Sequence, residues 1–290
     1  MSGEESTQGV RAIVRATARV GEGPVVDPRT GELCWVDILA GALLQSDLDA
    51  GATERWDFDT YLGAIAPRAS HPGFAVAASE GFGYAVAGEL VIEDPVLPDP
   101  DLRMNDAKCD PLGRLWAGSN HLAFAEGRGS LHRWDGRTSS TVIRRGLTLP
   151  NGLGWSADAR TMFLIDSMAG VVMRAPFDVD DGGVGEFEPF VTVDEGLPDG
   201  LAVDQEDCVW VAVWGASAVH RYDTAGRLAQ TVRMPVSQPS SCAFAADGAL
   251  FVTSARDGLT PEQLEREPLA GSVFAVDTDT RGVPIAAFAA

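Results

Sequence analysis

Residues 152–166 read GLGWSADARTMFLID, and this stretch carries the pattern that predicts the fold. Two short apolar runs, residues 152–155 and 162–165, flank a polar turn, which is typical of a β-hairpin. The pattern recurs along the chain. Four further clear copies begin near residues 24, 107, 200 and 241, and a weaker one spans residues 64–76 with a turn at His71-Pro72-Gly73.

The spacing and content of these copies favour one repeat architecture. The copies follow one another at roughly 40 to 47 residues, and further strand candidates follow the hairpins, for example residues 42–45, 129–134 and 218–222. About four strands in each repeat of this length is typical of a propeller blade. A sandwich would need fewer repeats, and a parallel α/β sheet would need helices, whereas only residues 261–267 read as a turn or two of helix. We therefore expect an all-β, six-bladed β-propeller with four-stranded antiparallel blades.

The two ends of the repeat array predict how the ring closes. Residues 11–16 form a strand candidate without a hairpin partner nearby, and the last repeat ends with the strand candidate at residues 272–276. We expect the N-terminal strand to complete the C-terminal blade, because this pairing leaves no open sheet edge between first and last blades. Residues 10–290 are then one domain, and the polar residues 1–9 read as a disordered leader.

A set of polar residues holds one position in the repeat. Each lies five residues ahead of the turn-side residue of its hairpin, and Gly or Pro flanks most of them, which leaves the side chain uncrowded. In a closed propeller these residues ring one end of the central channel. The set comprises Glu22, Asn105, Asn151 and Asp199, and by the same count Ser240 and Ala66 hold this position in the other two copies.

Carboxylate and amide oxygens that converge in this way predict a metal site. Unpaired carboxylates would repel one another at a cost of several kcal/mol, which a divalent cation removes. Oxygen ligands favour Ca²⁺, Mg²⁺ or Mn²⁺, and Zn²⁺ also accepts carboxylates. Few protein ligands leave coordination positions open for water and substrate, as in catalytic sites. The competing interpretation is that these Asn-Gly and Asp-Gly pairs are only turn dipeptides.

Composition excludes several classes of partner. The formal charge of −20 disfavours binding to nucleic acid and to anionic membranes. No apolar run reaches the length of about 18 residues that a membrane span needs, and the N-terminus lacks the features of a signal peptide. Four cysteines without a CxxC pair read as buried thiols of a reducing compartment. We expect a cytoplasmic protein, monomeric or weakly homo-oligomeric.

Short motifs in this order and spacing resemble one known family. The chain is similar, over nearly its whole length, to the senescence marker protein/gluconolactonase/luciferin-regenerating enzyme family. The matching segments are Gly21-Glu22-Gly23-Pro24, Arg103-Met104-Asn105-Asp106-Ala107-Lys108, residues 149–156, Ile165-Asp166-Ser167, Pro198-Asp199-Gly200, residues 240–244 and residues 253–258.

The resemblance implies a function and a set of roles. It implies hydrolysis of a sugar-acid lactone with Ca²⁺, Zn²⁺ or another divalent ion on a six-bladed propeller. By resemblance, Glu22, Asn151 and Asp199 would be the metal ligands, and Arg103 and Asn105 would contact substrate. We expect Asp199 to activate the attacking water, since it can touch both ion and water. The alternatives are an organophosphate or other ester hydrolase on the same scaffold and a non-catalytic calcium-binding propeller.

The sequence leaves open the substrate and the role of Lys108. Residues 119–128 differ from the longer, acidic loop of the animal lactonases, so the sugar is not predicted, and His121 or Glu126 of this loop either reaches substrate or is plain surface. Lys108, the only lysine, either holds its strand through an ion pair or is an ordinary partly exposed residue.

Overall fold

The computed structural model, which describes residues 4–6 and 9–290, has six blades of four strands each, and blade 4 carries a fifth strand of two residues, β18. Blades 1 to 3 contain, from the inner strand outward, β3 Gly21–Val26, β4 Leu33–Asp37, β5 Ala42–Asp47 and β6 Ala52–Asp57; β7 Leu62–Pro67, β8 Phe74–Ala78, β9 Gly81–Val86 and β10 Glu89–Pro95; β11 Leu102–Cys109, β12 Leu115–His121, β13 Gly129–Trp134 and β14 Thr141–Leu147. Blades 4 to 6 contain β15 Pro150–Trp155, β16 Thr161–Asp166, β17 Val171–Asp178, β18 Gly183–Val184 and β19 Glu188–Thr192; β20 Leu197–Val203, β21 Val209–Trp214, β22 Ala218–Tyr222 and β23 Leu228–Arg233; β24 Pro239–Phe244, β25 Leu250–Ser254, β26 Val273–Val276 and β2 Val10–Val14.

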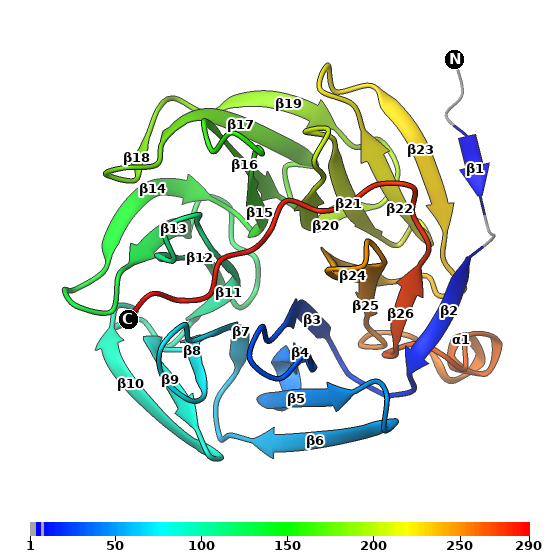
Figure 1. Ribbon diagram of the computed structural model, residues 1–290, viewed down its shortest axis with the longest axis horizontal. Helices are drawn as coiled ribbons and strands as arrows, with labels where there is room; N and C mark the ends of the chain where they lie inside the picture. Colours follow the sequence, from blue (N-terminus) through cyan, green and yellow to red (C-terminus); the bar gives the residue numbers. More distant parts are fainter. Residues whose placement is uncertain (1–3, 7–8) are drawn as a thin grey trace.

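The blades stand in a ring about a central channel (Figure 1), which confirms the six-bladed propeller. Each inner strand contacts the inner strands of the two neighbouring blades, including β24 with β3 across the closure. The predicted closure is also confirmed: β2 pairs antiparallel with β26, with Val10 opposite Val276 and Ala12 opposite Phe274. Helical structure in the described residues is limited to η1 Ile38–Ala40 and α1 Pro261–Arg266, and neither could cross a membrane.

Residues 1–9 differ in part from the predicted disordered leader. β1, Glu4–Ser6, pairs in parallel with the outer strand β23 of blade 5, with Glu4 opposite Gln230. The exposed backbone groups of an edge strand offer such pairing to any extended segment that reaches them. Residues 1–3, 7 and 8 lie outside the described residues, so the expectation for them stays a prediction.

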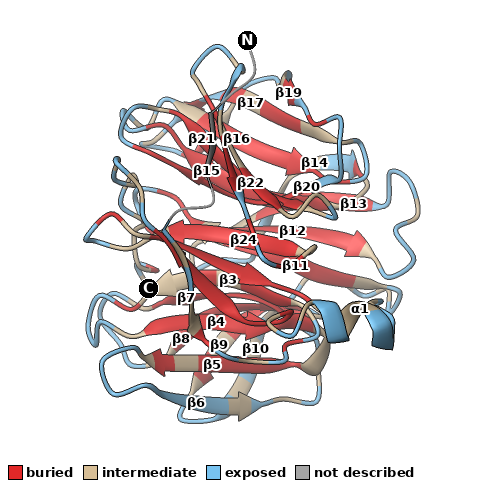
Figure 2. Cartoon of the chain, turned by 90° about the vertical axis from the view of Figure 1, so that its right-hand side faces the viewer, coloured by how far each residue is buried: buried red, intermediate tan, exposed pale blue. Residues whose placement is uncertain are grey.

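An Asp at the start of the hairpin turn holds the turn in blades 3 and 5. Asp110 accepts hydrogen bonds from Trp116 Nε1 at 2.9 Å and from Arg114 Nε at 2.6 Å. Asp204 repeats the arrangement in blade 5, with Trp210 Nε1 at 2.9 Å and an Arg partner. The indole rings lie fully buried in the inner half of the blades, where Figure 2 shows buried strands and exposed outer strands such as β6. In these two blades the turn Asp therefore satisfies the one polar atom of a buried indole.

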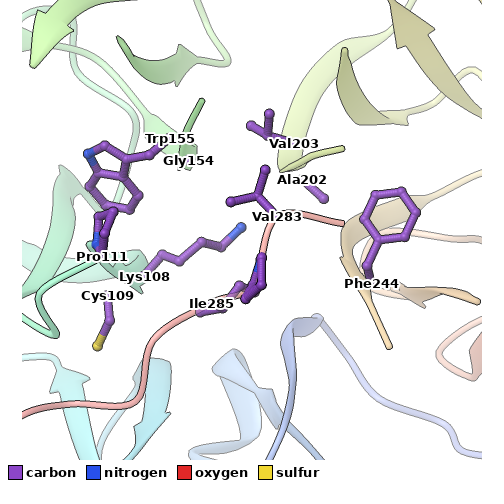
Figure 3. A pocket seen from close by; sticks show the side chains of 11 residues that line it. Lys108, Cys109, Pro111, Gly154, Trp155, Ala202, Val203, Phe244, Val283 and Ile285 are labelled. Carbon is purple, nitrogen blue, oxygen red and sulfur yellow. The ribbon is translucent and has the colours of Figure 1, made fainter. Parts of the chain in front are cut away.

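The last residues of the chain cross the end of the channel at which the inner strands finish. Figure 1 shows this segment as a red coil that runs over the ring. Val283 N donates to Val203 O at 2.9 Å, and Phe288 N donates to Pro67 O at 2.8 Å, so the segment bonds the last residues of two inner strands. Figure 3 shows Val283 and Ile285 beside Lys108 in a small pocket of this end. The segment narrows this end of the channel.

Phe288 anchors this C-terminal segment and gives a stability prediction. Its ring is fully buried and stacks on Trp134 with centroids 5.2 Å apart. We expect Phe288→Ala to lower the free energy of unfolding by about 3–5 kcal/mol, because the change removes buried area and leaves a cavity. Chemical denaturation followed by circular dichroism measures this loss. Leu228→Ala, at a 38% exposed side chain of β23, is the control, and a loss below about 1 kcal/mol for Phe288→Ala would contradict the anchoring role.

Candidate active site

The predicted ring residues occupy one position on successive inner strands, where the strand pairing is interrupted. Glu22 follows the first residue of β3, Asn151 follows the first residue of β15, and Asp199 is the third residue of β20. The register against the second strand shifts at this point in each blade, for example between Pro150 and Leu153. An extra residue in one strand re-aims a side chain, as bulges beside functional sites commonly do. The repeat therefore directs these polar side chains to the start of the channel.

The structure of blade 2 corrects the prediction that Ala66 is equivalent to the ring residues. Pairing of β7 with β8 sets Pro67 opposite Phe74, so Gly63, and not Ala66, is the residue equivalent to Glu22. The count failed because the turn begins with Arg68, where four of the other five blades have an Asp or Ser that marks it. A Cβ on Gly63 would lie 2.5 Å from Asn105 O, so this blade supplies close packing rather than a ligand.

Blade 6 also supplies no ligand. Ser240 is fully buried, and its Oγ donates to Gly21 O of blade 1 and lies 3.1 Å from Thr253 Oγ1. Its hydroxyl thus bonds blade 6 to blade 1 across the ring closure. The ring of six equivalent positions is polar and open to the channel on four blades only.

All five predicted site residues line one cavity at this mouth of the channel. Its volume is about 270 Å³, and Glu22, Arg103, Asn105, Asn151 and Asp199 are among its lining residues. Each of the five is less than a tenth exposed. The structure therefore brings together residues as far apart in the sequence as Glu22 and Asp199, which are separated by 177 positions. Their shared position in the repeat predicted this.

Arg103 and Asn105 form a hydrogen-bonded pair on β11. Arg103 Nη1 donates to Asn105 Oδ1 at 2.7 Å and to Met104 O at 3.0 Å. Asn105 Nδ2 donates to Pro150 O of the next blade at 3.1 Å. Burial lowers the pKa of Arg103 to about 10, with the charges of Glu22 and Asp199 opposing, so the guanidinium stays charged at neutral pH. The pair presents a fixed cation beside the two carboxylates.

Burial and mutual repulsion make the carboxylates unusually weak acids. Burial raises the pKa of Glu22 well above its usual range, and the charges of Asp199 and Asp106 raise it further. The pKa of Asp199 is also raised, by burial first and then by Asp106, while Arg103 and a hydrogen bond from Asn151 oppose the shift. Such a cluster favours a cation, which would offset the repulsion that the side chains cannot offset themselves.

Asn151 gives an independent sign that a cation fits here. Its Nδ2 donates to Ser167 Oγ at 3.1 Å and to Asp199 Oδ1. Its Oδ1 is buried and has no hydrogen-bond partner among the described residues. A buried amide oxygen without a partner costs about 1–3 kcal/mol, and a metal ion is one way to satisfy it. The donor set of two carboxylates and one amide oxygen fits a hard divalent cation.

Sequence reasoning missed Asp106 as part of the charge balance. Asp106 is buried on β11, one residue after Asn105, at a place where β3, β15 and β20 have Gly. Burial raises its pKa and the charge of Lys108 opposes the shift. Lys108 Nζ donates to Leu201 O at 2.6 Å, so it ties β11 to β20 through a carbonyl. An alignment of the six repeats would have found Asp106, because it is the only acidic residue at a position where three of the other inner strands have Gly.

The 119–128 loop contributes through a different residue from those considered. Phe124 lines the mouth cavity, whereas His121 and Glu126 are not among the lining residues. His121 Nδ1 instead accepts a hydrogen bond from Ala123 N at 3.0 Å, which shapes the loop. The signal available in the sequence was an aromatic residue within an otherwise small and polar loop.

A second acidic cluster lies in blade 5, and its two carboxylates already share an ion pair with Arg221. Asp204, Glu206 and Cys208 lie near one another at the start of the β20–β21 turn. Arg221 Nε donates to Asp204 Oδ2 at 2.8 Å and its Nη2 donates to Glu206 Oε2. The cluster belongs to the turn that fixes Trp210 and competes poorly as a metal site.

Comparison with known proteins finds similar chains over nearly the whole length of this one. The family model described as the SMP-30/gluconolactonase/LRE-like region matches residues 20–256. A 6-deoxy-6-sulfogluconolactonase of Pseudomonas putida is 31% identical, with 94% of this chain and 96% of that protein covered. Regucalcin of Danio rerio is 30% identical, with 95% and 96% covered. The crystal structure of regucalcin from Agrobacterium tumefaciens, described as a calcium-binding protein, is 28% identical and covers both chains completely with a TM-score of 0.94. Because the family model matches most of the propeller, the chain belongs to the SMP-30/gluconolactonase/LRE-like family.

Proposed function

We propose that the protein hydrolyses a sugar-acid lactone to the open-chain acid, with a divalent metal ion bound by Glu22, Asn151 and Asp199. The observation that carries the proposal is the unpartnered Oδ1 of Asn151 beside two buried carboxylates whose pKa values are raised. The names of the relatives, a sulfogluconolactonase among them, support the reaction class. Ca²⁺ and Zn²⁺ are the first candidates, and Mg²⁺ or Mn²⁺ would also suit the oxygen ligands.

The charges at the channel mouth suit a divalent ion. The carboxylates of Glu22, Asp106 and Asp199 face the cations of Arg103 and Lys108, which leaves one negative charge unneutralised among these five groups. When bound, a divalent cation polarises the lactone carbonyl and stabilises the negative charge that develops on its oxygen. Few protein ligands leave room for substrate in the cavity.

Asp199 is the proposed general base. It accepts a hydrogen bond from Asn151 Nδ2, which orients the carboxylate toward the cavity that it lines. Water adds to the carbonyl carbon while Asp199 takes one of its protons. The bond between the carbonyl carbon and the ring oxygen then breaks, and Asp199 returns the proton to that oxygen. The sum is one lactone and one water converted to one hydroxy acid.

Arg103 and Asn105 position the substrate. Arg103 is held by Met104 O and Asn105 Oδ1, so its guanidinium is preorganised and loses little freedom when a substrate binds. It lines the cavity as a buried cation and offsets the charge of the carboxylate product. Asn105 is fixed against Pro150 O in turn, which keeps the pair in register with Asn151 on the next blade.

A chelation experiment tests the proposal. Purified protein with a divalent ion is expected to release acid from δ-gluconolactone faster than the uncatalysed reaction, measured with a pH indicator. Activity should fall to background after dialysis against a chelator and return when Ca²⁺, Zn²⁺, Mg²⁺ or Mn²⁺ is added back. Lactone hydrolysis that is undiminished after complete removal of metal would contradict the metal-dependent reaction.

The same experiment separates the alternatives. A non-catalytic calcium-binding propeller would bind metal and leave every lactone intact. An organophosphate or other ester hydrolase would act on paraoxon or p-nitrophenyl acetate in preference to lactones. The buried Arg103 guanidinium in the cavity suits a substrate whose product is an anion.

We also propose a cytoplasmic, monomeric or weakly homo-oligomeric protein. Support for a reducing compartment comes from the four cysteines, which are all buried and free. Burial raises the pKa of the thiols, for example that of Cys34 to about 12, so they are poor nucleophiles and poor partners for oxidation.

A further inference from the structure

The cavity above the proposed metal ligands has a wall unlike its floor. Its floor carries the polar groups already described. Its wall consists of large apolar side chains from several blades, among them Ile38, Leu149, Phe124, Met168, Leu197 and Trp214. A pocket for a highly hydroxylated sugar ring would be expected to line its wall with hydrogen-bonding groups, because each sugar hydroxyl that leaves water needs a partner.

Three of these wall residues are exposed at the rim although they are strongly apolar. Phe124 is 43% exposed, Met168 is 47% exposed and Leu197 is 37% exposed. They come from the β12–β13 loop, the β16–β17 turn and the start of β20, so three consecutive blades present apolar side chains to one opening. A clustered apolar surface at the mouth of a cavity marks a binding site, whereas single exposed apolar residues are common.

The backbone of Phe124 supports a role in binding. Its φ is +53°, in the left-handed region that residues other than glycine seldom adopt. A hydrogen bond from Phe124 N to His121 O at 2.8 Å holds the turn that gives this conformation. The loop thus keeps an exposed aromatic ring at the cavity rim in a conformation that costs energy, a pattern that concentrates at functional sites.

Several of the polar groups that line the cavity already have partners within the protein. Arg103 donates to Asn105 and to Met104 O, and Ser167 Oγ accepts from Asn151 Nδ2. Asp257 forms an ion pair with Arg19 at 2.9 Å. The wall therefore offers little recognition for a ring of hydroxyl groups and much for an apolar group.

We propose that this enzyme prefers lactones that carry an apolar substituent, alkyl or aryl, packed against Phe124, Met168 and Leu197. The inference rests on the proposed lactonase function and extends its substrate class. In this binding mode the lactone carbonyl lies at the polar floor of the cavity. The substituent covers the apolar side chains of the wall and so shields them from water. Compact, fully hydroxylated lactones are hydrolysed less efficiently because they leave the wall unused.

A series of δ-lactones of increasing chain length tests this preference. Metal-loaded enzyme is assayed with δ-valerolactone, δ-hexalactone, δ-octalactone, δ-decalactone and δ-gluconolactone, and each kcat/KM is divided by the uncatalysed rate constant of that lactone. We expect this ratio to rise by about two- to fourfold for each methylene that contacts the wall. A ratio that is flat or falls with chain length, while δ-gluconolactone is hydrolysed, overturns the inference and leaves the proposed function standing.

Variants test whether the wall is responsible. The double variant Phe124→Ala, Met168→Ala should reduce the ratio of kcat/KM for δ-decalactone over δ-valerolactone at least tenfold. Leu112→Ala is the matched control, because Leu112 is 51% exposed in the β11–β12 turn and does not line this cavity. An unchanged ratio in the double variant would overturn the assignment of the wall.

Binding of unreactive analogues tests the wall without turnover. Alkyl δ-lactams keep the ring and carbonyl and resist hydrolysis, so calorimetry can measure their affinity for the metal-loaded protein. Affinity should rise with chain length in the wild type and in Leu112→Ala, and lose that dependence in the double variant. If no lactone of any kind is hydrolysed, the proposed function fails, and the lactam series still decides whether the apolar wall binds such groups.

Discussion

Asp199→Asn is expected to reduce kcat for lactone hydrolysis by about 10²–10⁴-fold while the protein stays folded. The substitution removes the group that takes the proton of the attacking water and keeps an oxygen of similar shape in the cavity. The hydrogen bond from Asn151 Nδ2 to this side chain can be kept, so the geometry of β15 and β20 is preserved. Initial rates with δ-gluconolactone and with an alkyl δ-lactone, at saturating metal, measure the loss.

The control for this variant is a distant carboxylate. Asp49→Asn changes an exposed residue of the β5–β6 turn and should leave kcat unchanged. Metal content is determined for each protein, so that loss of the ion and loss of the base are distinguished. An Asp199→Asn protein that binds the ion and retains full turnover would exclude Asp199 as the base.

Glu22→Gln is expected to weaken metal binding by more than about 100-fold and to stabilise the metal-free protein. The side chain is buried, and Glu22 Oε2 accepts a hydrogen bond from Gly23 N at 3.0 Å, which a Gln oxygen can also accept. The carboxylate is repelled by Asp199 and Asp106, and a neutral amide removes that repulsion. Calorimetric titration with Ca²⁺ and Zn²⁺ measures the first effect.

Thermal denaturation in the presence of a chelator measures the second effect. Because the pKa of Glu22 is raised in the folded state, the metal-free wild type loses stability as pH rises through that pKa, and Glu22→Gln lacks this contribution. The variant should therefore gain stability over the wild type as pH rises. Glu126→Gln, an exposed residue of the mouth loop, is the control for both measurements. A Glu22→Gln protein with wild-type affinity for metal would remove Glu22 from the ligand set.

The fold was largely predictable because the residues of the repeat have the same structural role in several blades. The turn acids Asp110 and Asp204 accept from buried indoles, so in these two hairpins one residue both marks the turn in the sequence and holds it in the structure. Phase within the repeat then located Glu22, Asn151 and Asp199 on three inner strands. Counting from the turn gave the wrong residue in blade 2, because Arg68 begins that turn in place of an Asp or Ser. The count predicted Ala66, whereas the strand pairing shows that Gly63 is equivalent to Glu22.

Other features depend on three-dimensional packing that the local sequence does not encode. The C-terminal segment lies across the channel because Phe288 finds a pocket formed by Tyr84 and Trp134, on strands far from it in sequence. The apolar wall of the mouth is built from single residues of separate loops, such as Phe124 and Met168, and none of these loops has a repeat pattern. Asp106 was passed over because its neighbour Asn105 already filled the expected position.

The measurement that tests the central claim most directly is anomalous diffraction from crystals grown with Mn²⁺ or Zn²⁺ at low concentration. We predict one strong anomalous peak at the mouth of the channel, from an ion coordinated by Glu22, Asn151 and Asp199. This peak should be absent from crystals of Glu22→Gln. A peak at Asp204 and Glu206, or no peak at the channel mouth in active protein, would contradict the metal site on which the proposed function depends.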